Sequence, residues 1–290
     1  MQRRKFIESS IALSAAGLVS PSLLKNDLMP ETKSLEKKDD ISIAQWALVE
    51  EIKAGKWKNL DFPKIAREDF GVNGIEFVNT LFEVPTENYL KQLKQNAKDH
   101  GVTMVLIMCD AEGDGADDTK EGQKQFAINH YKWVDIAHYL GCHAIRTNCR
   151  GPQNADKKEA LKWATDAYNQ LLEYAKPANI SIVIENHGGV SNDADWMVDL
   201  VKKLNNPLFG TYPDWRQPSK EFDNYEYLKK TLPYAKGMSY RNQPDDALTI
   251  KMIELSKKGG YKGWYGIESS GREAIKKGIE LLKKHLLNQS

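Results

Sequence analysis

Three acidic residues of this sequence, Glu185, Asp214 and Glu268, each follow a short run of apolar residues. The runs are β-branched or aromatic, and polar and glycine residues follow them, which is typical of buried strands that end in loops. In a parallel barrel, the strand ends on one face point toward a common centre. Three carboxylates that converge there repel one another unless a cation compensates them. The pattern therefore predicts a divalent metal ion bound by these three residues, and oxygen ligands favour Mn²⁺, Mg²⁺ or Co²⁺.

The elements that position these residues follow a regular rhythm. From residue 41 onward, a strand pattern and then a helix pattern recur every ~30–40 residues, which is typical of βα units. The predicted strands span residues 41–48, 74–78, 102–108, 144–148, 180–185, 208–212, 235–240 and 264–268. Helix-stop signals such as Leu140-Gly141 lie between them. Eight units predict an α/β fold, a single (β/α)8 TIM barrel over residues 41–288. An open doubly wound sheet is the weaker alternative, because no G-x-G-x-x-G motif follows the first strand.

Other polar residues at predicted strand ends are candidates for the same pocket. Glu76 follows an apolar run, where it either reaches the pocket or caps its strand. Arg146 and Asn148 end the fourth strand, and their donors suit substrate oxygens unless they form a surface ion pair instead. His187 lies two residues after Glu185 and so on the same strand face. It is a candidate hydrogen-bond partner of a ligand, proton shuttle or extra ligand, with a structural role as the alternative.

Several further features have more than one interpretation. Trp46 and Trp215 end strands, where they form either an apolar pocket wall or part of the core. His130 lies on an apolar helix stripe, which favours a core histidine. Residues 110–121 nearly match a calcium-binding loop, but a strand rather than a helix precedes them. An acidic lid over the pocket is therefore favoured over a calcium site.

From about residue 41 to 287 the chain resembles the xylose isomerase-like TIM barrels, a family of sugar phosphate isomerases and epimerases. The resemblance is carried by Asn73-Gly74-Ile75-Glu76, the run from Ala137 to Arg146, Glu185-Asn186-His187, Asp214 and Gly266-Ile267-Glu268. Such barrels hold one divalent ion through Glu, Asp, His and Glu on strands five to eight. The resemblance implies Glu185, Asp214 and Glu268 as ligands, with the two glutamates also acting as acid and base.

The seventh strand departs from the family pattern. Where relatives often read His-x-Lys-Asp, this chain reads Ser239-Tyr240-Arg241-Asn242. Ser239 is a poor metal ligand, so the fourth coordination position is open. Arg241 is expected to bind substrate.

The resemblance implies chemistry next to a carbonyl group. A divalent ion bound to a hydroxy-ketone polarises the carbonyl and eases removal of the neighbouring C–H proton. Carboxylates on both sides of the sugar can take and return that proton, which gives isomerisation or epimerisation of a keto-sugar. If a leaving group lies β to the carbonyl, the same enolate expels it, as in a lyase acting on 3-keto-glycosides. A catalytically lapsed carbohydrate-binding barrel is a third alternative, which the missing histidine keeps open.

Composition fits a soluble enzyme with a small-molecule substrate, which the resemblance implies is a carbohydrate. The 290 residues are 41% hydrophobic and 28% charged, which suits one large core. The net charge is +1 and no basic block occurs, which argues against a nucleic-acid partner. An apurinic endonuclease-like nuclease needs more histidine ligands and a basic groove than six histidines and this charge provide. The oligomeric state stays open.

The first residues resemble a twin-arginine export signal. Arg3-Arg4-Lys5 precedes an uncharged stretch rich in Ala, Ser, Leu and Gly. We expect a signal peptide over residues 1–28, a charged linker over residues 29–40 and a periplasmic mature protein. The uncharged stretch is too short and too weakly apolar for stable insertion in a membrane.

The three cysteines are predicted to be buried free thiols. Three cysteines cannot all pair, and Cys142 and Cys149 flank one predicted strand, so an extended backbone holds these two too far apart for a disulfide. A chain without disulfides is compatible with folding before export.

We expect the double substitution Arg3→Lys and Arg4→Lys to block export, because the twin-arginine route reads this pair. The measurement is the share of the protein in the periplasmic fraction of a Gram-negative cell. Unchanged periplasmic recovery of the double variant would show that another route carries the protein.

Overall fold

The computed structural model describes residues 40–217 and 219–287. The predicted signal peptide and nearly all of the predicted linker lie outside these residues. The strands are β1 (Ile41–Ala44), β2 (Gly74–Val78), β3 (Thr103–Met108), β4 (Ala144–Thr147), β5 (Ser181–Glu185), β6 (Phe209–Tyr212), β7 (Met238–Tyr240) and β8 (Tyr265–Ile267). All eight coincide with predicted strands. The first is shorter than expected, because Gln45–Leu48 turns into a 3₁₀ helix.

The strands form one parallel sheet that curls into a nearly closed barrel. Their order is β6-β5-β4-β3-β2-β1-β8-β7, and every ladder between neighbours is parallel. The two edge strands, β6 and β7, meet through two isolated parallel bridges, Thr211 with Ala235 and Asp214 with Ser239. The prediction of a (β/α)8 barrel is confirmed, and the doubly wound alternative is wrong because the two edges come together.

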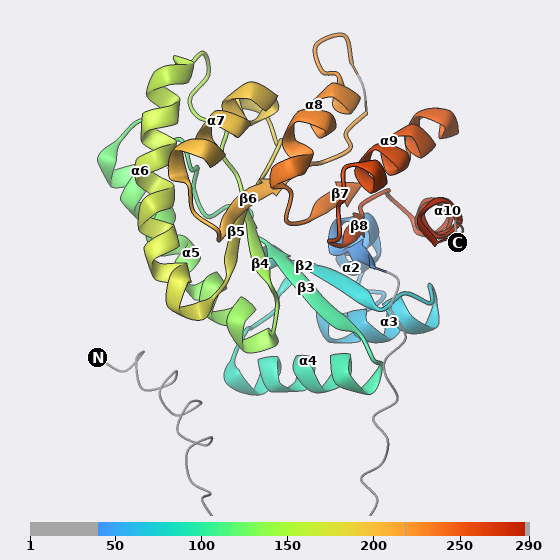
Figure 1. Cartoon of the computed structure of the whole chain (residues 1–290). Helices are drawn as coiled ribbons and strands as arrows, with labels where there is room; N and C mark the ends of the chain where they lie inside the picture. The colour runs from blue at the N-terminus through green and yellow to red at the C-terminus, as the bar shows by residue number, and fades with distance from the viewer. Residues whose placement is uncertain (1–39, 218, 288–290) are drawn as a thin grey trace, which may run out of the picture. The chain divides into compact units, whose positions relative to one another are not determined.

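Helices connect successive strands and lie outside the barrel (Figure 1). The α-helices are α2 (Val49–Lys53), α3 (Phe62–Glu68), α4 (Glu87–Asp99), α5 (Lys120–Leu140), α6 (Lys157–Ala175), α7 (Ala194–Leu204), α8 (Asn224–Thr231), α9 (Asp246–Lys258) and α10 (Arg272–Leu282). Short 3₁₀ segments span Asn59–Asp61, Asn79–Leu81, Lys176–Ala178, Gly189–Asn192 and Leu232–Tyr234, and a π turn spans Lys283–Leu287. Side-chain caps fix several helix starts: Asp156, for example, accepts hydrogen bonds from the first amides of α6.

Two apolar cores hold the barrel together. The smaller one fills the barrel interior and consists of Ala44, Val78, Val105, Leu106, Met108, Ala144, Val183 and Tyr212. The larger one lies between strands and helices, as the apolar helix stripes predict. His130 belongs to it: the ring is fully buried, its Nδ1 lies 2.8 Å from the Phe126 carbonyl oxygen, and burial lowers its pKa to about 4. The prediction of a core histidine is confirmed.

Other local predictions also hold. Cys109, Cys142 and Cys149 are buried free thiols. Helix α5 ends at Gly141, whose φ of 83° is the left-handed conformation that glycine adopts without strain. Among the described residues, no helix is both long enough and apolar enough to cross a bilayer.

Candidate active site

The alternation of strand side chains brings the candidate residues to one end of the barrel. Residues two apart on a strand share a face, so the inward series continues past each strand end into the loop. The pairs that follow this rule are Arg146 and Asn148, Glu185 and His187, Tyr212 and Asp214, Ser239 and Arg241, and Gly266 and Glu268. The register of the last strands places the pairs side by side, because Asp214 bridges to Ser239 and Ser239 pairs with Gly266.

The three predicted carboxylates converge. One oxygen each of Glu185, Asp214 and Glu268 lies within 4.8 Å of the other two. Their exposed fractions are only 1%, 5% and 6%. The barrel therefore concentrates three acidic groups in a space that water hardly enters, and the chain has to stabilise their charge.

Two arginines lie against these carboxylates. Arg146 is buried, and its guanidinium contacts Asp110 Oδ1 at 2.7 Å and Glu185 Oε2 at 2.9 Å. Arg241 donates from Nε to Asp214 Oδ1 at 2.7 Å and holds Nη2 at 2.8 Å from Glu268 Oε1. Each carboxylate of the cluster therefore faces at least one guanidinium.

The residues fit a divalent ion. Glu185 Oε2 is buried and has no hydrogen-bond donor, since the nearby Nε of Arg146 is out of line for a hydrogen bond. A carboxylate oxygen without a donor, next to two further carboxylates, suits a hard cation. The donor set contains only oxygen, which favours Mg²⁺, Mn²⁺ or Co²⁺ over a thiolate zinc site.

The pKa values of the three carboxyls shift in different directions: that of Glu185 is lowered, and those of Asp214 and Glu268 are raised. Burial opposes ionisation of Glu185, but Arg146 and His187 outweigh it and hold the pKa of this carboxyl at about 2. Burial raises the pKa of Glu268 to about 7, and the neighbouring carboxylates add to this effect against Arg241. Asp214 follows Glu268, since burial and the Glu185 charge raise its pKa to about 6. The guanidinium of Arg146 thus favours the ionised form of Glu185, whereas burial beside other carboxylates disfavours the ionised forms of Asp214 and Glu268.

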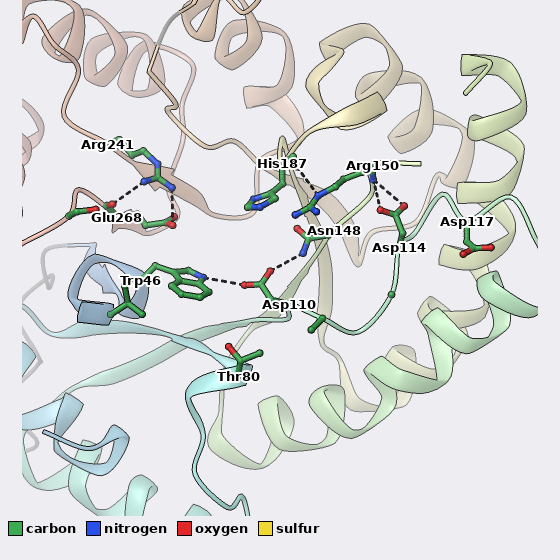
Figure 2. Close-up of a pocket in the computed structure, with 14 residues that line it drawn as sticks. Trp46, Thr80, Asp110, Asp114, Asp117, Asn148, Arg150, His187, Arg241 and Glu268 are labelled. Carbon is green, nitrogen blue, oxygen red and sulfur yellow. Dashed lines mark hydrogen bonds and ion pairs between the residues drawn. The ribbon is translucent and has the colours of Figure 1, made fainter. Parts of the chain in front are cut away.

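Glu268 of the cluster lines a cavity of about 980 Å³ (Figure 2). Glu268 and Arg241 lie at one end, and Asp114 and Arg150 lie at the other. Its volume is at the upper end of the roughly 300–1,000 Å³ that ligand pockets occupy. A smaller cavity of about 300 Å³ is also lined by Arg241, together with Asp214. Glu268 and Asp214 therefore each line a cavity, whereas Glu185 lines neither.

The predicted site residues divide between the cleft and the layer beneath it. Asn148 and His187 line the cleft, and so does Trp46, whose indole donates to Asp110 Oδ2 at 3.2 Å. Arg146 does not line it but lies buried below and orients Asp110 and Glu185. Glu76 does not line the cleft either, because it is fully buried within the barrel. Trp215 is a core residue, packed against Tyr240 and Tyr265.

Asp110 is a site residue that sequence reasoning did not single out. Its carboxylate accepts hydrogen bonds from Arg146 at 2.7 Å and Asn148 at 2.8 Å, besides the Trp46 indole. These bonds connect three different strand ends across the wall of the cleft. The signal that could have found it is the alternation of β3, because Asp110 continues the inward series of Leu106 and Met108.

The acidic loop after β3 is held by the chain itself. Asp114 accepts hydrogen bonds from the backbone amides of Ala116, Arg150 and Gly151. Glu112 accepts from the Trp133 indole and pairs with Lys132. These carboxylates face different partners rather than a common point, which argues against a calcium site. The loop instead forms part of the cleft wall, where the sequence placed an acidic lid.

Comparison with known proteins identifies the family. Residues 65–239 match the family model of the xylose isomerase-like TIM barrel. The chain belongs to the xylose isomerase-like TIM barrel family. No curated protein matches its sequence.

Solved structures share the barrel at low sequence identity. A D-tagatose 3-epimerase-like protein is 16% identical with a TM-score of 0.70, over 85% of this chain and 96% of the other. The 3-keto-D-glucoside 4-epimerase of E. coli is 13% identical with a TM-score of 0.67, over 85% and 100%. The D-psicose 3-epimerase of Clostridium cellulolyticum H10, solved with D-tagatose, is 14% identical with a TM-score of 0.64, over 86% and 92%. At this identity the likeness shows the fold alone.

Glu76 is a buried acid below the site of this xylose isomerase-like barrel. It accepts hydrogen bonds from Ser42 Oγ at 2.6 Å and from the hydroxyl of Tyr212 across the barrel. A Cβ at Gly266 would lie 2.3 Å from its Oε2, so glycine leaves room for the carboxyl. Burial raises the pKa of Glu76 to about 7, with a further contribution from Glu268 and Glu185.

We expect Glu76→Gln to change how stability depends on pH. Because the folded protein holds the Glu76 proton up to about pH 7 while the unfolded chain releases it near its ordinary pKa, Glu76 stabilises at low pH and loses this effect as pH rises from about 4.5 to 7. Relative to wild type, the variant should gain about 1–3 kcal/mol of unfolding free energy between pH 5 and pH 8. Urea denaturation across this range, with exposed Glu280→Gln as control, measures it. A difference that stays constant with pH contradicts the assignment.

Proposed function

We propose that the protein is a metal-dependent sugar isomerase or epimerase that abstracts the proton next to the carbonyl of a keto-sugar. The observation that carries the proposal is Glu268, a member of a buried three-carboxylate cluster that also reaches a ligand-sized cleft. The family and the sugar epimerases among the similar structures support the same class of chemistry.

Glu185, Asp214 and Glu268 are the residues that would hold the ion. A Mn²⁺, Mg²⁺ or Co²⁺ ion bound there would polarise the substrate carbonyl and so acidify the neighbouring C–H group. The chain supplies the remaining functions. Asn148 lines the cleft and can donate hydrogen bonds to sugar oxygens, while the indole of Trp46 forms a wall suited to the apolar face of a sugar ring.

Glu268 is the proposed base on one side of the substrate. Its carboxylate lines the cleft and is oriented by two contacts, the Ser239 hydroxyl at 2.6 Å from Oε2 and Arg241 at 2.8 Å from Oε1. The side chain of Glu268 is held by both contacts and still lines the cleft. Glu268 can therefore remove a proton from a ligand bound above it.

On the opposite side of the substrate, we assign a histidine to the role that the family resemblance implied for a second glutamate. Glu185 is sealed below the cleft by Arg146 and is only 1% exposed. His187 is 42% exposed in its side chain, lines the cleft, and holds Nδ1 at 3.5 Å from Glu185 Oε2. We assign proton delivery on this side to His187, with Glu185 orienting its imidazole and Arg146 positioning Glu185.

A lyase acting on 3-keto-glycosides is the second candidate, favoured by the volume of the cleft, about 980 Å³. Removal of the proton by Glu268 would give an enolate, and expulsion of the β-alkoxy group with protonation would complete the elimination. The far part of the cleft, lined by Asp114, Asp117 and Arg150, has room for a leaving group beyond the reacting ring. In both proposed reactions, the first step is removal of the same proton by Glu268.

We also propose that the protein works in the periplasm, on the strength of the Arg3-Arg4 pair alone. Such a location disfavours phosphorylated sugars as substrates and favours free or glycosidic keto-sugars.

We expect Glu268→Gln to lower exchange of the substrate α-proton with solvent deuterium by at least about 10²–10⁴-fold, because the amide cannot accept the proton. The measurement is NMR-detected exchange with Mn²⁺, Mg²⁺ or Co²⁺ on a ketohexose or 3-keto-glycoside that the wild type turns over. Glu280→Gln removes an exposed carboxylate of α10 and should leave exchange unchanged.

Two outcomes count against the proposal. Exchange at the wild-type rate in Glu268→Gln removes Glu268 from the mechanism. A wild-type protein that binds keto-sugars but neither exchanges the proton nor turns any of them over is a carbohydrate-binding barrel without catalysis.

A further inference from the structure

Arg241 sits where the carboxylate cluster needs a positive charge. Its guanidinium spans two of the three candidate ligands, with Nε at 2.7 Å from Asp214 Oδ1 and Nη2 at 2.8 Å from Glu268 Oε1. A third bond runs from Nη1 to the Glu268 carbonyl oxygen at 3.2 Å. Three contacts from one rigid fork make Arg241 the cation of the cluster on its cleft side.

The residue two positions earlier strengthens this arrangement. Ser239 donates to Glu268 Oε2 at 2.6 Å, so both oxygens of Glu268 are already bound by the chain. In the cluster, Glu185 Oε2 is the buried oxygen that lacks a donor. A divalent ion entering here finds Asp214 and Glu268 held by Arg241, whereas Glu185 Oε2 faces Arg146 at 2.9 Å without a hydrogen bond.

Electrostatic repulsion prevents the Arg241 guanidinium and a divalent ion from contacting Asp214 and Glu268 at the same time. An ion bound to Asp214 and Glu268 would lie beside the guanidinium, and charges of the same sign repel strongly in a space with little water. Arg146 already faces Glu185 from below, so it cannot take over the contacts of Arg241. The side chain of Arg241 is 29% exposed and lines both cavities, which gives it a place to move when it is displaced.

We propose that Arg241 is a counter-ion built into the carboxylate cluster, where it competes with the divalent ion for Asp214 and Glu268. In the metal-free protein, Arg241 then compensates the charges of Asp214 and Glu268. Metal binding requires the guanidinium to leave these two carboxylates. The proposal rests on the metal site of the proposed function but not on its reaction. The change in Mn²⁺ affinity tests the role of Arg241, and proton exchange tests the reaction.

The test is the affinity for Mn²⁺, measured by calorimetry and by the loss of the free-ion EPR signal at fixed pH and ionic strength. Arg241→Gln should bind Mn²⁺ at least tenfold more tightly than wild type, which corresponds to about 1.4 kcal/mol. Arg241→Lys keeps the charge but cannot span both carboxylates, so its affinity should lie between the two. Its retained charge also protects the fold if the glutamine variant is unstable.

Arg272→Gln is the matched control. Arg272 also bridges two carboxylates, Glu51 and Asp69, but on a different part of the surface. Its loss should leave Mn²⁺ affinity unchanged. Equal or weaker binding by folded Arg241→Gln and Arg241→Lys overturns the proposal, as does a complete lack of Mn²⁺ uptake in all variants. Proton exchange by the wild type is scored separately and decides the proposed reaction.

Discussion

The burial of three carboxylates side by side is the constraint on which the rest of the site depends. Glu185, Asp214 and Glu268 repel one another where water cannot screen them, so positive charge has to be present in the same space. Arg146 and Arg241 provide it within the chain. Removing one partner of such buried pairs typically costs about 3–5 kcal/mol, because the remaining charge is left without compensation.

One of these ion pairs also crosses the seam at which the two edges of the sheet meet. Strands β6 and β7 share only isolated bridges, one of which joins Asp214 to Ser239. The ion pair of Arg241 with Asp214 crosses this seam, and its contacts with Glu268 tie in β8. Arg241 and Asp214 therefore add a side-chain contact between the two edge strands, so a change of Arg241 should affect local stability as well as the proposed metal binding.

The two glutamates of the cluster have different surroundings although their strands end alike. Glu185 lies below the cleft against Arg146, whereas Glu268 lines it beside Ser239 and Arg241. In the proposed reaction, Glu268 therefore meets the substrate on one side and His187 serves the other side. A cleft with one carboxylate base and one imidazole can still take and return a proton on opposite sides.

The sequence by itself determined the barrel, its eight strands and the convergence of the acidic strand ends, because hydrophobic alternation and helix stops are local signals. Alternation even separates Trp46, which continues the inward series of Ala44, from Trp215, which lies one position out of the series of Asp214. The tertiary structure alone decided that Arg146 is buried and that Arg241 bridges two carboxylates. These contacts join side chains 27 to 39 residues apart, such as Arg241 with Asp214 and Arg146 with Glu185, and only the packing of neighbouring strands fixes which charges meet.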